Sequence, residues 1–400
     1  MKDIRRAARR SRRIDDLTAL LLTLPLLVFM TVFFVLPIGG ILKESATDPV
    51  ITKNLPRTAE LLSQLQWNTL PDAPLVAALG SELLQADQKG TVGAISRRLN
   101  TDVSGYRSLL TKTVSAIKRD FPLTLADMAG IDKRWSDPAY WSALKRASGT
   151  PSSYYLLAAV DLKRDDFGSV AKQPEHVATF LPILLRTLVI SIVVTAICVI
   201  VTVPLSYFIS NLSEKRAAIA LFFVMLPFWT SALVRITGWT VLLQKDGIVN
   251  QVIQLASPGV QPLEMLYTDF SMYLGLIHLM LPFMLVPIYT AMRQVDPLTK
   301  KAALSLGARP LPAFLRVFLP QCARGIGSGC AIVFILTLGT YTTPVLLGGA
   351  GQQMLSYFIS FYTNQQLNWN MAAALSVVLL IMTIIVCRLG ARFFVKERAD

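Results

Sequence analysis

The chain has 400 residues, of which 53% are hydrophobic and 16% are charged, and its mean hydropathy is +0.51. Soluble domains carry about a quarter charged residues, so this composition excludes an ordinary soluble enzyme, and its hydrophobicity excludes a disordered chain. The formal net charge of +14 fits either nucleic acid or a membrane surface, and its distribution has to decide between them. The four cysteines show no Cys-x-x-Cys spacing, which argues against a disulfide framework and a zinc knuckle. The composition indicates a membrane protein.

Six apolar runs are long enough to cross a bilayer, which takes about 20 mostly apolar residues. We predict transmembrane helices over 17–42, 183–210, 218–243, 271–292, 323–347 and 370–393. The first run follows a basic segment, as in a signal peptide, but it is longer than the apolar core of about 7–15 residues that signal peptides have. Because no Ala-x-Ala-like cleavage site follows, we interpret it as a retained helix, with a cleaved signal as the alternative.

Basic residues lie almost entirely on one side of these spans. Segments 1–16, 211–217, 293–324 and the tail from 388 hold nineteen Lys and Arg, whereas loops 244–270 and 348–369 hold one. Cytoplasmic loops carry this excess, so both termini are expected in the cytoplasm. The net charge is then explained by topological anchors, and a DNA-binding role for the Arg-rich start becomes the weaker alternative.

The segment 43–182 is therefore expected to be extracytoplasmic. Its 17 basic and 15 acidic residues nearly balance. Apolar residues recur at helical spacing over 58–65 and 105–119, and prolines and glycines divide the segment into short helices. We predict a small helical domain that folds without cysteine, with a polar linker over 161–175 that leads into the second span.

These observations predict an all-α membrane protein with six transmembrane helices and a helical extracytoplasmic domain inserted between helices 1 and 2. The expected divisions are a basic cytoplasmic N-terminus (1–16), transmembrane helix 1 (17–42), the extracytoplasmic domain (43–182), a five-helix core (183–393) that contains a cytoplasmic loop (293–322), and a cytoplasmic tail (394–400).

The five later spans contain no Asp or Glu, which weakens the hypothesis of a proton- or sodium-coupled carrier. Arg186 lies at the outer end of its span, where its side chain can reach the interface. Arg235 lies deeper, facing either a water-filled path or a backbone carbonyl or helix end. His278 has no second ligand at metal-binding spacing, which favours a packing role. No catalytic constellation or metal site is visible, and the chain has no Gly-Lys dipeptide, so any ATP site is expected on another polypeptide.

The cytoplasmic loop 293–322 has a readable local structure. Asp296 is a good N-cap and Pro297 suits the first helical position. Gly307 is expected to end this helix in the left-handed conformation. A second helix is expected to start near Pro310 and to carry Phe314 and Phe318. On these grounds alone the loop is either a docking element or a structured connection between spans.

This stretch resembles the EAA motif of ABC importer permeases, in which a short coupling helix docks into a groove of the ATPase subunit. The residues at matching positions are Ala302, Ala303, Gly307, Ala308, Leu319 and Pro320. Lys301 departs from the motif, because the family has Glu there.

Other segments resemble the spermidine/putrescine permease branch of this family, over roughly residues 180–395. They are Pro227-Phe228-Trp229-Thr230, Leu233-Val234-Arg235 with Trp239, Leu281-Pro282-Phe283, Leu338-Gly339-Thr340-Tyr341-Thr342-Thr343-Pro344, Leu347-Gly348-Gly349 and Asn368-Trp369. The segment 43–182 is longer than expected for polyamine permeases.

The resemblance implies a type I-like importer permease fold in the bacterial inner membrane and no cofactor bound by the chain itself. It also implies several partners: membrane lipid, a second permease, ATPase subunits that bind ATP, and a periplasmic binding protein that delivers the solute. Nucleic acid is not expected as a partner.

Candidates for the translocation path are Trp229, Arg235, Trp239 and Tyr341. Cation–π contacts with the aromatic residues would ease the passage of a polyamine, although these residues also suit a core or an interface belt. Opines, amino-acid derivatives and other small organic solutes stay open. The competing classes are an ATP-independent carrier or channel and, more remotely, a membrane enzyme.

Overall fold

The computed structural model describes residues 21–121, 124–149, 151–165, 167–175 and 178–396, without the side chains of 393–396. The expected basic N-terminus, the first four residues of the first span and residues 397–400 of the tail lie outside the described residues. The chain forms two compact units. The first comprises Met1–Gln173 and Asn368–Val377, and the second comprises Pro174–Leu367 and Val378–Asp400.

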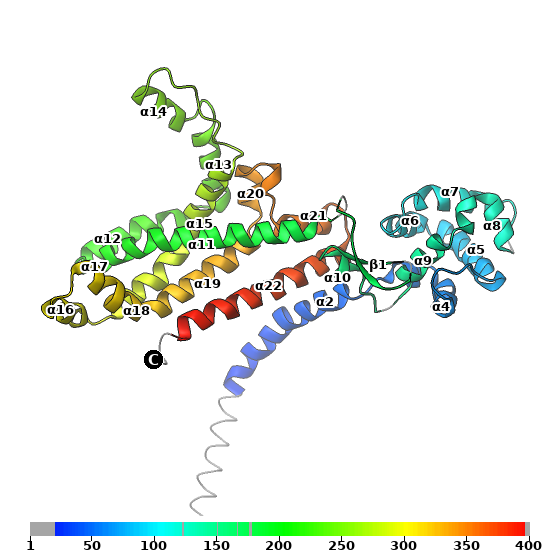
Figure 1. The fold of residues 1–400 in the computed structure, drawn as a ribbon, viewed down its shortest axis with the longest axis horizontal. Helices are drawn as coiled ribbons and strands as arrows, with labels where there is room; N and C mark the ends of the chain where they lie inside the picture. The colour runs from blue at the N-terminus through cyan, green and yellow to red at the C-terminus, as the bar shows by residue number, and fades with distance from the viewer. Residues whose placement is uncertain (1–20, 122–123, 150, 166, 176–177, 397–400) are drawn as a thin grey trace, which may run out of the picture. The chain divides into compact units, whose positions relative to one another are not determined.

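The first unit is mostly helical (Figure 1). It contains a long helix, Leu21–Ser45, within which Thr31–Val35 forms a π-turn (η1) and Leu36–Ser45 is α2. Short helices follow: α3 (Pro49–Asn54), α4 (Pro56–Gln64), α5 (Ala73–Gln88), α6 (Val92–Asn100), α7 (Tyr106–Ile117), α8 (Leu125–Ile131), the 3-10 helix η2 (Lys133–Ser136), α9 (Pro138–Ala147) and α10 (Tyr154–Ala158).

The helices α3 to α9 enclose one hydrophobic core. At its centre the rings of Trp135 and Trp141 lie 5.0 Å apart, and both are fully buried. The indole N–H of Trp135 donates to the Thr113 hydroxyl at 2.9 Å, and that of Trp141 donates to the carbonyl of Trp135 at 2.8 Å. Buried indoles need such partners, so this core is specified by hydrogen bonds as well as by packing.

A buried carboxylate organises the start of α4. Glu82 accepts hydrogen bonds from the backbone N–H groups of Arg57 (2.8 Å) and Thr58 (2.9 Å) and from the Thr58 hydroxyl (2.6 Å). The first N–H groups of a helix have no partner within the helix, and a negative charge is favoured there. Glu82 on α5 therefore fixes α4 against α5.

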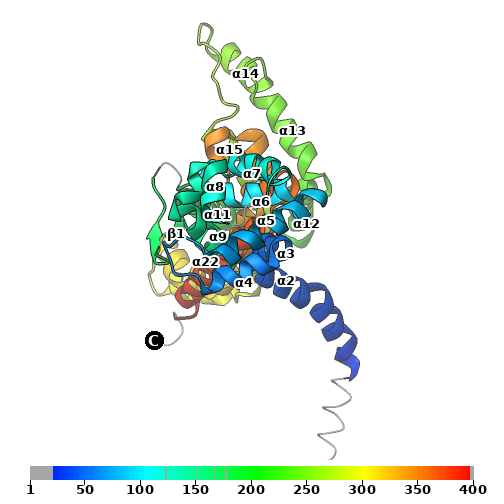
Figure 2. The ribbon, with the colours of Figure 1, turned by 90° about the vertical axis from the view of Figure 1, so that its right-hand side faces the viewer.

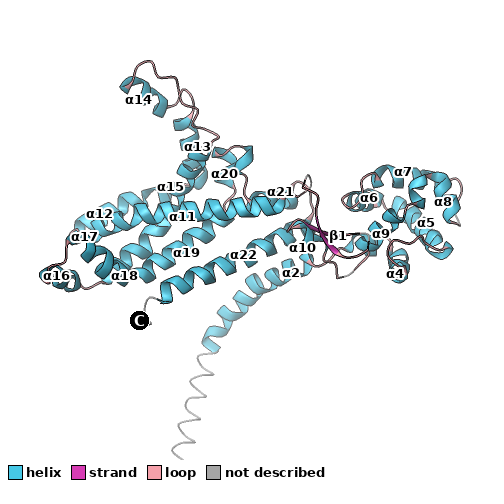
Figure 3. Ribbon diagram, viewed as in Figure 1, coloured by secondary structure: helices cyan, strands magenta, loops and turns pink. Residues whose placement is uncertain are grey.

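The segment 161–175 is not only a linker. Leu162–Arg164 (β1) and Val170–Lys172 (β2) pair antiparallel as a small hairpin, coloured magenta in Figure 3. Its turn is closed by the Asp165 carboxylate, which accepts from the N–H groups of Phe167 (3.0 Å) and Ser169 (2.8 Å), while Gly168 has φ +81°. Asp and Gly at these turn positions are typical of a hairpin turn. They were not recognised from the sequence, because the whole segment is polar and therefore also suits a linker.

The second unit contains the remaining helices. They are α11 (Phe180–Ser210), α12 (Glu214–Met225), the 3-10 helix η3 (Leu226–Trp229), α13 (Ala232–Leu243), α14 (Ile248–Ala256), α15 (Asp269–Gln294), α16 (Pro297–Ser305), α17 (Pro310–Ala313), the π-helix η4 (Phe314–Phe318), α18 (Leu319–Gln321), α19 (Ala323–Gly339), α20 (Thr342–Leu347), the 3-10 helix η5 (Ala350–Gln352) and α21 (Leu355–Asn364). The last helix, α22 (Trp369–Lys396), contributes its first residues to the first unit.

Three long helices, α11, α15 and α19, pack against one another in this unit. One face of α15 is buried at every fourth position, through Met272, Leu276, Met280, Met284, Ile288 and Met292. The helix α19 approaches α15 closely, because a Cβ atom at Gly325 would lie 2.7 Å from the carbonyl oxygen of Pro287. Small residues allow such close packing, which is typical of membrane helix interfaces.

Four helices of the described chain are long and apolar enough to cross a membrane, or six if each of two bent pairs counts as one span. The four are Leu21–Ser45, Phe180–Ser210, Asp269–Gln294 and Trp369–Arg392. The first bent pair, Glu214–Trp229 with Ala232–Ala256, covers the expected third span, and the second, Pro310–Gln321 with Ala323–Gly339, joins the end of the expected cytoplasmic loop to the fifth span. The chain is thus of membrane type, and the number of six spans stays a prediction.

The sequence predicted one continuous helix over the third run, 218–243, but the structure shows a break there. Glu214–Trp229 and Ala232–Ala256 are bent by 93° about Thr230 and Ser231, which have extended backbone. Pro227 fixes its own φ and lacks an N–H group, which favours a break in this region. Helices α13 and α14 consequently project away from the α11–α15–α19 bundle in both views (Figures 1 and 2).

The fifth run is also interrupted. The helix α19 ends at Gly339, Thr340 is extended, and α20 begins at Thr342. A continuous helix would bring the ring of Pro344 against the carbonyl of Thr340, four residues earlier, so the proline favours a break at this point.

Candidate functional site

The expected loop helix is present as α16, and its ends are formed as the sequence predicted. The Asp296 carboxylate accepts from the N–H of Leu298 at 2.8 Å, and Pro297 occupies the first turn. Gly307 has φ +90°. The N–H groups of Gly307 and Ala308 donate to the carbonyls of Leu304 and Ala303, each at 3.0 Å. These two bonds define a Schellman cap, which turns the chain sharply after the helix.

The segment from α16 to the beginning of α17 exposes several large apolar side chains. None of the residues of α16 is buried. Four leucines of this segment project outward, with exposed fractions of 65%, 39%, 89% and 66% at Leu298, Leu304, Leu306 and Leu311. A short loop with several exposed large apolar side chains is typical of a surface that binds another protein or a membrane.

The six motif residues fall into two groups. Ala302, Ala303, Gly307 and Ala308 form the end of α16 and its cap, where Ala302 and Gly307 are exposed. Leu319 and Pro320 begin α18, and Leu319 packs partly buried against the main core of the second unit. The structure therefore places four of the motif residues at the exposed tip and two at its base.

The base of the loop is held by an aromatic cluster, which we define as Tyr207, Phe314 and Phe318. The Tyr207 ring of α11 lies 4.7 Å from the Phe314 ring and 5.4 Å from the Phe318 ring of η4. The Lys300 ammonium group of α16 donates to the Tyr207 hydroxyl. Sequence reasoning treated Lys300 only as a topological anchor and did not identify Tyr207. The aromatic pair Phe314 and Phe318, four residues apart, was the available signal for an aromatic partner.

Two of the four path candidates lie together on α13. Arg235 and Trp239 are separated by one helical turn, so they share a face. The Trp239 indole N–H donates to Nδ1 of His278 on α15 at 3.0 Å. The histidine is therefore a partnered residue, as the sequence favoured, and its Nδ1 is the acceptor nitrogen.

The Nε and Nη1 atoms of the Arg235 guanidinium are buried and have no hydrogen-bond partner within the described part of the chain. The two alternatives for Arg235, a water-filled path and a pairing with a backbone carbonyl or helix end, stay predictions.

The other two candidates lie elsewhere in the unit. Trp229 ends η3 with 85% of its surface exposed, and Tyr341 precedes α20 with 43% exposed. Among the described residues, no hydrogen bond or ring contact links either aromatic residue to Arg235 or Trp239. The structure of one chain does not assemble the four candidates into a single site.

Arg186 contacts the irregular segment that precedes α21. Its guanidinium donates to the backbone carbonyls of Gly351 and Gln353, and the adjacent Thr187 hydroxyl accepts from the N–H of Leu355 at 2.9 Å. The beginning of α11 is thereby fixed to the segment that leads into α21. Carbonyl groups at irregular backbone compete effectively with water for an arginine in an apolar setting.

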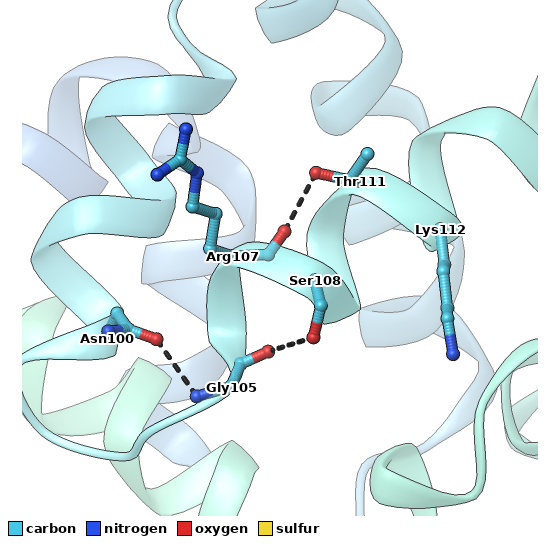
Figure 4. A pocket seen from close by; sticks show the side chains of 6 residues that line it. All are labelled: Asn100, Gly105, Arg107, Ser108, Thr111 and Lys112. Atoms are coloured by element: carbon cyan, nitrogen blue, oxygen red, sulfur yellow. Dashed lines mark hydrogen bonds between the residues drawn. The ribbon is translucent and has the colours of Figure 1, made fainter.

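A surface pocket of ≈ 620 Å³ lies beside α7 in the first unit (Figure 4). Its lining residues are Asn100, Gly105, Arg107, Ser108, Thr111 and Lys112. The Asn100 side-chain oxygen Oδ1 accepts from the Gly105 N–H at 2.9 Å, and the hydroxyls of Ser108 and Thr111 donate to backbone carbonyls (Figure 4). These polar groups serve the local backbone, so the geometry does not indicate a solute site.

Comparison with known proteins identifies relatives of this chain. It is 34% identical over 197 residues to the spermidine/putrescine transport system permease protein PotB of Haemophilus influenzae, covering 49% of this chain and 69% of that protein. It is 34% identical over 229 residues to the inner membrane ABC transporter permease protein YdcU of Escherichia coli K12, covering 52% and 72%. The E. coli K12 PotB is 29% identical over 203 residues, covering 51% and 74%. No family model matches the chain.

Solved structures give weaker similarities. A bacterial alginate ABC transporter in complex with an alginate-bound periplasmic protein aligns with a TM-score of 0.47 and 17% identity, over 55% of this chain and 80% of that one. An amino acid ABC transporter aligns with a TM-score of 0.36 and 18% identity, over 54% and 92%.

The two relatives at 34% identity are matched over more than two thirds of their length. The chain therefore belongs to the ABC transporter permease family, in the group that includes the spermidine/putrescine permeases. It is a multi-pass inner-membrane protein and a transport subunit rather than a catalytic enzyme.

Proposed function

We propose that this chain is the transmembrane permease subunit of an ATP-driven importer and that α16 is its coupling helix. The carrying observation is the exposed, rigidly capped α16 with its outward-facing leucines. A capped helix of fixed direction suits insertion into a groove, because little conformational entropy is lost when it docks.

The importer would contain a second permease and two ATPase subunits that bind ATP. Closure of the ATPase dimer on ATP would displace the coupling helices, and the permeases would switch between inward- and outward-facing forms. In this arrangement Gly307 sets the direction of the chain after α16, and Ala302, Ala303, Ala308, Leu319 and Pro320 complete the ATPase-coupling loop.

The proposed topology has six spans, with both termini and the loop 293–322 in the cytoplasm. It rests on the excess of Lys and Arg in those short segments. The domain 43–182 is then extracytoplasmic, where it would contact the binding protein or cover the entrance of the pore.

We propose a polyamine, such as putrescine or spermidine, or a related small organic solute as the cargo. The names of the relatives support this class. A periplasmic binding protein would deliver the solute and supply most of the selectivity. The chain's own contribution would come from Trp229, Arg235, Trp239 and Tyr341 along the path.

The experiment is a mild-detergent pull-down of the tagged chain from its native host, followed by uptake in proteoliposomes. Recovery of an ATPase and a second permease, with ATP-dependent uptake of labelled putrescine or spermidine in the presence of the binding protein, is the expected result. Recovery of the chain alone, in a detergent that preserves a known ABC complex, would favour an ATP-independent carrier. Assembly with an ATPase but without polyamine uptake would redirect the search to other solutes.

A further inference from the structure

We infer that Tyr207 and Lys300 form a latch that transmits the movement of the coupling helix to α11. The inference rests on the proposed function, because it needs an ATPase that moves α16. The latch consists of the hydrogen bond from the Lys300 ammonium to the Tyr207 hydroxyl.

The first argument concerns how α16 is attached. Since none of its residues is buried, α16 has no core packing of its own to carry a force. It packs on α17 and η4. Among the described residues, the side-chain hydrogen bond that joins α16 itself to α11 is the one between Lys300 and Tyr207.

The second argument concerns Tyr207, which contacts the loop in two ways. Its hydroxyl binds Lys300, and its ring packs edge-on against Phe314 and Phe318 of η4. A displacement of the loop in either direction therefore acts on one side chain of α11. Discrete packed contacts of this kind carry conformational coupling between distant sites.

The third argument concerns the end of α11. Pro204 lies inside this helix one turn before Tyr207. It cannot donate a hydrogen bond to the carbonyl of Ile200, which weakens the helix at this point. The last turns of α11, from Pro204 to Ser210, can consequently tilt with Tyr207 at lower cost than an unbroken helix.

The neighbouring lysine provides a matched control. Lys300 is half-buried and directed to Tyr207, whereas Lys301 is exposed at the adjacent position of the same helix. If positive charge on α16 served only to bind the ATPase, Lys301 would be the better placed of the two. The latch predicts the reverse order of importance for coupling.

The test uses the complete transporter in proteoliposomes, with labelled putrescine as the probe, and measures solute uptake, ATP hydrolysis and the amount of bound ATPase. Tyr207→Phe keeps the ring contacts and removes the acceptor, and Lys300→Met keeps the apolar stem and removes the donor. We expect both variants to retain the ATPase and to hydrolyse ATP, while solute moved per ATP falls about tenfold, the effect of one lost charge-assisted hydrogen bond. Lys301→Met should keep the wild-type ratio.

The double variant Tyr207→Phe with Lys300→Met should be no worse than either single variant, because both remove the same interaction. A wild-type ratio in the single variants, an equal fall in Lys301→Met, or loss of bound ATPase in parallel with uptake would overturn the latch. A wild-type chain that binds no ATPase would instead overturn the proposed function, and an assembled transporter that takes up no putrescine would overturn the choice of a polyamine as cargo; both results are visible separately from the latch.

Discussion

The cap at Gly307 offers the sharpest perturbation of the coupling loop. The residue has φ +90°, and no atom lies within 4 Å of the position that a Cβ would occupy. A substitution there meets open space, so its cost is backbone strain alone. For an L-residue in the left-handed region this strain is about 1–2 kcal/mol, and it is larger for a β-branched residue.

The chain can relieve the strain only by giving up the cap. It would then lose the two hydrogen bonds from Gly307 and Ala308, each 3.0 Å long. Two such bonds are together worth about 1–3 kcal/mol, the same size as the strain, so the substituted chain loses its strong preference for the capped geometry. A cost of about 1.4 kcal/mol reduces the population of the capped conformer, relative to uncapped conformers, about tenfold.

We expect uptake to be highest with the wild-type Gly307 and to fall progressively in the variants with Asn, Ala and Val at this position. Asn tolerates the left-handed conformation and should stay near wild type, Gly307→Ala should lose about tenfold, and Gly307→Val should be inactive while still inserted in the membrane. The assay is uptake in proteoliposomes, normalised to inserted protein. Gly390→Ala in α22, where a Cβ also meets open space in a helix, is the control and should be neutral. Wild-type uptake by an inserted Gly307→Val variant would refute this reasoning.

Three further predictions follow from the packing and charges. Gly325→Val should lower the thermal stability of the detergent-solubilised protein by at least about 1–3 kcal/mol, because its side chain would overlap the backbone of Pro287; stability equal to that of Gly390→Val would contradict the α15–α19 packing. Trp229→Ala should leave thermal stability unchanged, since the ring is 85% exposed, but should reduce uptake if the ring lines the path or contacts a partner; unchanged uptake would remove Trp229 from the path. The hydrogen bond from Arg134 holds the pKa of Asp132 below its usual value of 3.8, so this pair stabilises the helical unit above that pH. The contribution, less than about 1 kcal/mol, is lost as the pH falls below about 4. In the variant Arg134→Gln, thermal stability should fall less steeply over this pH range than in the wild type, and an identical pH profile would contradict the pair's role.

The sequence predicted the parts of this molecule that local chemistry determines. The cap at Asp296, the turn at Gly307 and the helix that follows Pro310 each depend on residues within a few positions, and the structure confirms all three. The apolar character of the long runs likewise predicted membrane-type helices.

Other features depend on residues that are distant in the chain. The contact of Tyr207 with Lys300 joins positions 93 residues apart, and the contacts of Arg186 join it to carbonyls more than 160 residues away. Hydropathy also does not show where a helix changes direction inside an apolar run. The breaks at Thr230 and Thr340 were therefore missed, although Pro227 and Pro344 indicate them. The hairpin at 162–172 was missed because its turn residues lie in a polar stretch that also suits a linker.

The central claim, that α16 docks an ATPase, is tested most directly by photo-crosslinking in intact cells. A photoreactive residue replaces Leu306, which is 89% exposed beside the cap, and a second variant carries it at Leu255, which is 82% exposed on α14. The account predicts an adduct between position 306 and an ABC ATPase subunit, identified by mass, and none between position 255 and that subunit. Adducts of position 306 with lipid or with no protein, in cells that express the intact chain at normal levels, would contradict the claim.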